Sequence, residues 1–113
     1  MRVSNVISAN AVQEKLNEFQ AENIVTLNVA ELTTVTSEMI ICTANSQPHA
    51  QALLREVSDQ AKAMNEYVHV EGDDTLEWII VDLGHIVVHI MLQEFRDFYQ
   101  LESLWDIQPQ NEL

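Results

Sequence analysis

The chain has 113 residues, of which 47% are apolar, so it has the length of one domain and enough apolar side chains for a core. Acidic residues outnumber lysine and arginine by 18 to 5, which gives a formal net charge of −13. This charge argues against direct nucleic-acid recognition, which needs basic residues at the phosphates; it suits either a basic protein partner or solubility alone.

Cys42 is the only cysteine and lies in the apolar run MIICT. One cysteine cannot form an intrachain disulfide or a multi-cysteine zinc site, and a thiol in such a run is typically buried and inert. No apolar run is long enough to cross a bilayer, and the N-terminus lacks the apolar core of a signal peptide. We therefore expect a reducing, cytoplasmic setting.

The first third of the chain predicts a helix followed by a strand. Ser8 or Asn10 can cap a helix that runs to about Glu22, because apolar residues recur there at helical spacing. Alternating residues over 24–29 predict a strand, and residues 32–37 read as a short connection.

The next segment predicts a buried strand and a longer helix. The apolar run 38–43 is typical of a central strand that is covered on both faces. A helix is expected to begin near Ser46, with Pro48 in its first turn, where the missing N–H costs nothing. One face of this helix carries the apolar residues Leu53, Leu54, Val57, Ala61 and Met64.

Three strands and a helix are expected in the remaining part, with strands over 67–71, 77–83 and 85–91 and a helix over 93–100. The element order indicates a single α/β domain over residues 1–107, with a mixed sheet flanked by helices, and a polar tail over residues 108–113. We expect the helix that begins near Ser46 to join parallel neighbouring strands as a right-handed crossover. The last three strands should form an antiparallel meander.

A hairpin in the second half has an unusual composition. If Leu83-Gly84 forms its turn, the expected cross-strand pairs on one side are Asp82 with His85, Ile80 with Val87 and Trp78 with His89. The other side is wholly aliphatic and should be core. An aliphatic centre with a polar rim and a tryptophan is typical of a protein interface, but a covering helix would equally make Trp78 and His89 core residues.

The same hairpin tests for a metal site. His85 and His89 have the HxxxH spacing of zinc ligands on a helix, but four residues on a strand span roughly 13 Å, too far for one ion. The alternative function is a small metal-dependent hydrolase or transferase that uses Asp82, His85 and His89. The sequence has no glycine-rich phosphate loop and no GxSxG motif, and we expect no cofactor.

Residues 71–105 carry a family resemblance. The series EG…W…VDLG…VVHI…E.R.FY.LE.LW, together with the upstream segment MIICTANSQPHAQAL, resembles the ribosomal silencing factor family, also called the Iojap family. The match covers residues 24–105, which is most of the chain.

The resemblance implies a fold similar to nucleotidyltransferases, but the chain lacks the glycine-serine loop and the aspartate pair of those enzymes. It also implies a factor, not an enzyme, that binds the large ribosomal subunit through its L-fourteen protein, blocks joining of the small subunit when nutrients are short, and forms a homodimer when free. An acidic, aromatic face would complement that basic protein. We place seven residues at or behind this partner-binding face: Trp78, Asp82, His89, Tyr99, Leu101, Glu102 and Trp105.

Overall fold

The computed structural model describes residues 7–30 and 36–99, and the side chains of these as far as residue 97. Its elements are α1 (Ala9–Glu18), β1 (Glu22–Asn28), β2 (Glu38–Ala44), α2 (Gln47–Ala63), β3 (His69–Glu71), β4 (Trp78–Asp82), β5 (Ile86–Leu92) and α3 (Gln93–Tyr99). The predicted order of helices and strands is confirmed. The predicted tail 108–113 and most of the predicted connection 32–37 lie outside the described residues.

Serine side chains cap the two longer helices. Ser8 accepts a hydrogen bond from the Ala11 N–H, and Ser46 accepts one from the His49 N–H at 3.2 Å. The helix α1 ends before the predicted boundary at Glu22, because Gln20 adopts a positive φ of 68°. A residue in the left-handed region cannot continue a right-handed helix.

The five strands form one mixed sheet in the order β1-β2-β5-β4-β3. β2 and β5 are parallel, and the other neighbours are antiparallel, so the predicted mixed sheet and the final meander are confirmed. The prediction that α2 joins neighbouring strands is wrong, because β5 and β4 lie between β2 and β3. The meander folds back toward β2, so its last strand takes the position beside β2.

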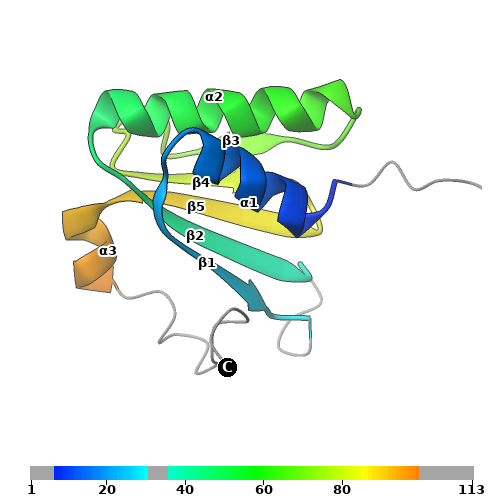
Figure 1. Cartoon of the computed structure of the whole chain (residues 1–113), viewed down its shortest axis with the longest axis horizontal. Helices are drawn as coiled ribbons and strands as arrows, with labels where there is room; N and C mark the ends of the chain where they lie inside the picture. Colours follow the sequence, from blue (N-terminus) through cyan, green and yellow to red (C-terminus); the bar gives the residue numbers. More distant parts are fainter. Residues whose placement is uncertain (1–6, 31–35, 100–113) are drawn as a thin grey trace, which may run out of the picture.

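The helices α1 and α2 cover one face of the sheet (Figure 1). The main core lies between them and the sheet, and it includes Val12 and Leu16 of α1, Leu53 and Val57 of α2, and Ile79 of β4, all fully buried. Burying one such aliphatic side chain contributes about 1.5–3 kcal/mol to folding. Within residues 7–30 and 36–99, no helix is long and apolar enough to cross a membrane.

The central strand β2 is buried on both faces, as its apolar run predicts. Ile40 and Cys42 point into the main core, while Met39 and Ile41 belong to a second cluster on the opposite face. That cluster also contains Leu27, Val29 and Met91, with Phe95 of α3 packed against it. The sheet therefore has two apolar faces, and α1 and α2 cover only one of them.

Candidate partner-binding face

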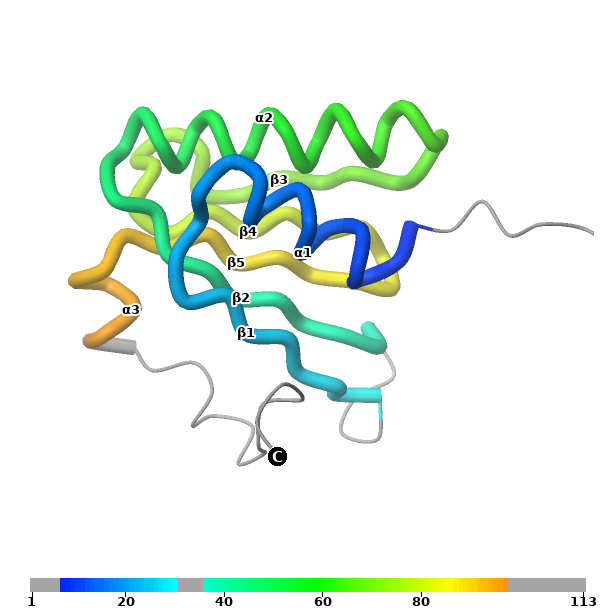
Figure 2. Tube along the Cα trace, viewed as in Figure 1, coloured from blue at the N-terminus to red at the C-terminus, as the bar shows by residue number. Residues whose placement is uncertain are grey.

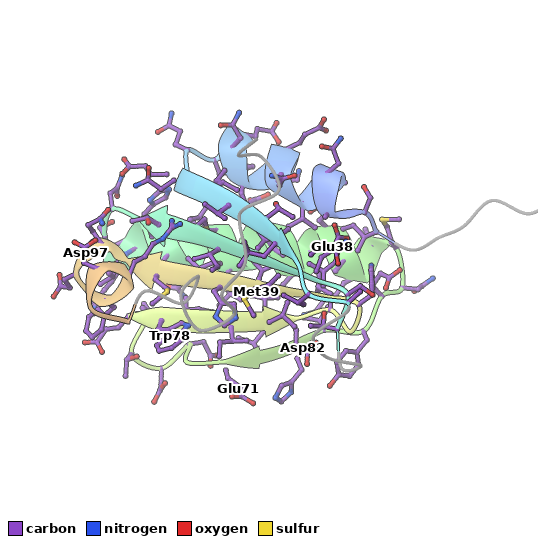
Figure 3. The ribbon with its side chains drawn as sticks, turned by 90° about the horizontal axis from the view of Figure 1, so that it is seen from below. Glu38, Met39, Glu71, Trp78, Asp82 and Asp97 are labelled. Atoms are coloured by element: carbon purple, nitrogen blue, oxygen red, sulfur yellow. The ribbon has the colours of Figure 1, made fainter. Side chains whose placement is uncertain are left out.

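We call the face of the sheet opposite α1 and α2 the helix-free face, because neither of these two helices packs on it; of α3, Phe95 contacts its buried cluster. Strand alternation and pairing place on it Val25, Leu27, Met39, Ile41, Thr43, His69, Glu71, Trp78, Ile80, Asp82, Val87, His89 and Met91. Figure 3 looks onto this face and shows Met39, Trp78, Asp82 and Glu71 across it.

Exposure on the helix-free face is lowest around β2 and highest on β4 and β3. Leu27 and Ile41 are fully buried, and Met39 is 7% exposed. Toward the β3 edge of the same face, five side chains are half-buried or exposed. We call them the β3–β4 patch: Glu71, Trp78, Ile80, Asp82 and Val87. This patch combines aliphatic and aromatic surface with two carboxylates, which is the composition of a protein-binding surface.

The register of the β4–β5 hairpin differs from the predicted one. Asp82 pairs with Val87 and Ile80 pairs with His89, so every predicted cross-strand pair is shifted by two positions. The reason is the turn: Gly84 has a φ of 89°, and the Leu83 N–H donates to the Ile86 carbonyl at 2.8 Å, so the two loop residues are Gly84 and His85. Glycine at the first loop position is the pattern of a type II′ turn.

The shift by two leaves the two faces of the hairpin unchanged, because side chains alternate with a period of two. Trp78, Ile80 and Asp82 still share a face with Val87 and His89, as predicted. The other side carries Ile79, Val81, Val88 and Ile90, all fully buried against the helices, which confirms the predicted aliphatic core side.

Trp78 and His89 form a diagonal pair on the helix-free face. The indole Nε1–H donates to Nδ1 of His89 at 2.9 Å, and the two ring centroids are 6.0 Å apart. Trp78 is half-buried and His89 is 7% exposed. Burial lowers the pKa of His89 to about 4, because desolvation disfavours the imidazolium. The pair is therefore a neutral hydrogen-bonded unit at pH 7.

The three residues of the alternative metal site do not converge. Asp82 accepts the Gly84 N–H at 2.8 Å and so stabilises the turn, while His89 pairs with Trp78. Nε2 of His85 lies 2.6 Å from the Ile7 carbonyl oxygen. This contact holds the start of α1 near the β4–β5 turn, and the two segments lie close together along the Cα trace (Figure 2). In the described ranges, no group of three or more metal-ligating side chains could hold an ion. The geometry gives no support to a metal-dependent enzyme that uses these residues.

The predicted partner-binding residues fall into two groups. Trp78, Asp82 and His89 lie together on the helix-free face, as described above. Tyr99 is the last residue of α3, and its side chain lies outside the described residues. Leu101, Glu102 and Trp105 also lie outside them, so the structure does not test their placement.

Arg96 is a residue whose position the sequence analysis did not predict. It is 9% exposed and donates to Thr43 Oγ1 at 3.0 Å and to the Asn23 carbonyl, so it ties α3 to β2 and to the start of β1. A weak signal was present in the sequence, because Arg96 lies between two phenylalanines, Phe95 and Phe98, in a predicted helix. Its partners are 53 and 73 residues away in the chain and leave no local pattern.

Comparisons with known proteins find close similarity in sequence and in fold. A family model described as "Ribosomal silencing factor during starvation" matches residues 4–113. The chain is 38% identical over 104 residues to the ribosomal silencing factor RsfS of Bacillus subtilis, with 91% of this chain and 85% of that protein covered.

A solved structure and a eukaryotic protein are also similar to this chain. A crystal structure of a Chromobacterium violaceum protein has a TM-score of 0.85 and 31% identity to this chain, with 96% of this chain and 89% of that one covered. A mouse protein named mitochondrial assembly of ribosomal large subunit protein 1 is 31% identical over 96 residues, which cover 81% of this chain and 42% of that protein.

Proposed function

The chain belongs to the ribosomal silencing factor family, which confirms the resemblance noted in its sequence, and from this premise we propose that it is a cytoplasmic translational silencing factor. It binds the large ribosomal subunit through the L-fourteen protein and sterically blocks joining of the small subunit, which lowers translation under nutrient limitation. It turns over no substrate, and when free it forms a homodimer. The observation that carries the proposal is the family match over nearly the whole chain.

The β3–β4 patch supports this proposal from the geometry. Ile80, Val87 and Trp78 supply half-buried apolar area, and Glu71 and Asp82 place carboxylates beside it. A ribosomal protein with lysine and arginine on its surface complements both the patch and the net charge of −13. Apolar contact at the centre and charge at the rim would give the contact its stability and its specificity.

Charge reversal on two opposite sides of the molecule tests the proposal. Glu71→Lys changes an exposed residue at the β3 edge of the patch, and Asp59→Lys makes the same change on the exposed side of α2. We expect Glu71→Lys to weaken cosedimentation with large subunits and to restore subunit joining in a light-scattering assay. Asp59→Lys should behave like the wild type, because it lies on the opposite side of the molecule.

The same experiment separates the parts of the proposal. A wild-type chain that does not cosediment with large subunits contradicts the function itself. Equal effects of Glu71→Lys and Asp59→Lys would mean that the patch is not the contact surface. A chain that binds large subunits but does not bind the isolated L-fourteen protein in calorimetry would place the ribosomal contact on another component.

A further inference from the structure

One ring nitrogen of His89, Nδ1, is hydrogen-bonded to Trp78, and the other, Nε2, has no hydrogen-bond partner among residues 7–30 and 36–97. Trp78 donates its indole N–H to Nδ1 at 2.9 Å, and an indole nitrogen can only donate, so Nδ1 must be the acceptor. A neutral imidazole carries one proton, and that proton is therefore on Nε2. Burial, which lowers the pKa of His89 to about 4, keeps the ring in this neutral form at pH 7.

The Nε2–H group lies in apolar surroundings. His89 is 7% exposed. Its cross-strand neighbours on the same face are Ile80 of β4 and Ile41 of β2. Residues 7–30 and 36–97 supply a hydrogen-bond partner for Nδ1 and supply none for Nε2. Nε2 is not among the buried side-chain atoms that lack a hydrogen-bond partner in this part of the chain, so it keeps some contact with solvent. A surface that packs over it displaces this solvent and must supply an acceptor, because a buried unpaired donor costs free energy.

The accessible neighbours of His89 indicate where that group comes from. Ile80 and Val87 are half-buried and belong to the β3–β4 patch, so a surface that packs on the patch comes next to the imidazole. The partner must bring an acceptor, and the lysine and arginine side chains of a basic protein have none. A partner carboxylate would meet Asp82 and Glu71 of the same patch, which are carboxylates themselves. A main-chain carbonyl satisfies all these conditions.

We propose that His89 is a recognition residue whose Nε2–H donates a hydrogen bond to a main-chain carbonyl oxygen of the basic protein that packs on the β3–β4 patch. Trp78 is then a positioning residue, because its indole N–H fixes the tautomer that presents the donor. This inference rests on the proposed function and specifies which atom of the chain forms a hydrogen bond with the partner's main chain.

Two amide substitutions separate the two nitrogens of the ring. The side chain of His89→Asn ends near the Nδ1 position, so its oxygen still accepts from Trp78 while the outward donor is lost. The side chain of His89→Gln reaches the Nε2 position and carries an N–H₂ group there, while it loses the acceptor at Nδ1. A role confined to the pairing with Trp78 would make His89→Asn the better-tolerated change, and a recognition role would make His89→Gln the better-tolerated change in binding.

The test measures the affinity of the full chain and of both variants for purified large ribosomal subunits by cosedimentation, with urea unfolding as a control for stability. We expect His89→Asn to bind at least about tenfold more weakly, because the partner's carbonyl is left unpaired, and His89→Gln to stay within about threefold of the wild type. Long-range ¹H–¹⁵N spectra should show the Nε2–H tautomer in the wild type and a mixture of tautomers in Trp78→Phe.

Each other outcome overturns the inference in a recognisable way. Equal binding by both variants and the wild type removes the recognition role while the proposed function stands. A wild type that does not bind large subunits contradicts the proposed function. If His89→Asn weakens self-association of the free chain and leaves subunit binding unchanged, the acceptor belongs to a second copy of this chain and the assignment to a basic partner is wrong.

Discussion

The guanidinium group of Arg96 in α3 donates a hydrogen bond of 3.0 Å to Thr43 Oγ1 in β2, at a buried position. The same group donates to the Asn23 carbonyl at the start of β1. Arg96 thus joins the last described helix to two strands, and its neighbour Phe95 packs against the second apolar cluster. One charged side chain fixes α3 at the end of the helix-free face.

Replacing Arg96 by leucine should lower the free energy of unfolding by about 2–4 kcal/mol, because the Asn23 carbonyl and the Thr43 hydroxyl lose their buried donor. Urea unfolding followed by circular dichroism measures this change. Arg55→Leu is the matched control, because Arg55 is exposed on α2, and it should change stability by less than about 0.5 kcal/mol. Equal losses in the two variants would contradict the anchoring role of Arg96.

The two glycines should respond differently to alanine. Both have positive φ, 82° at Gly72 and 89° at Gly84, so both substitutions introduce strain of about 1–3 kcal/mol. At Gly72 the new Cβ would also lie 2.1 Å from the Trp78 carbonyl oxygen, whereas nothing lies within 4 Å at Gly84. Thermal unfolding should therefore show a much larger loss for Gly72→Ala, with displacement of Trp78 visible in its fluorescence. Similar melting temperatures for the two variants would be inconsistent with this close approach.

Stability should depend on pH through His89. Its pKa is about 4 in the folded state, and its ordinary value of 6.5 applies to the unfolded state. Between pH 4 and pH 6.5, the unfolded state therefore binds a proton at His89 more readily than the folded state. The contribution to stability is complete above pH 6.5 and is lost as the pH falls toward 4. Between pH 8 and pH 5 this amounts to about 2 kcal/mol.

The pH dependence can be isolated with His89→Gln, which removes the titrating group and leaves the other ionisable residues in place. Urea unfolding at pH 8 and pH 5 should show a smaller loss of stability on acidification in the variant than in the wild type, by about 2 kcal/mol. Parallel pH profiles would mean that His89 titrates normally in the folded protein.

Cys42 should be unreactive in the folded protein. It is fully buried in β2, and burial raises the pKa of its thiol to about 12, so almost no thiolate is present at pH 8. A thiol reagent such as DTNB should react with the native chain only at the rate of opening, and should react promptly in 8 M urea. Rapid modification of the native chain would show that β2 is more accessible than the structure indicates.

The sequence by itself determined the features that depend on local physics. The helix begun by Ser46, the doubly buried strand β2 and the two faces of the β4–β5 hairpin follow from capping, apolar runs and alternation. The grouping of Trp78, Asp82 and His89 on one face was predicted for the same reason, since alternation is insensitive to a register shift of two. The motifs of residues 71–105 also identified the family.

Only the tertiary structure decided the features that depend on contacts between distant segments. The pairing of β2 with β5 and the anchoring of Arg96 on Thr43 join parts of the chain that are about 50 residues apart, and no local pattern encodes them. The hairpin register depended on the positive φ of Gly84, which placed the loop one residue later than expected. That shift set His89 opposite Ile80 and diagonal to Trp78, and so placed the imidazole beside the half-buried aliphatic residues of the β3–β4 patch.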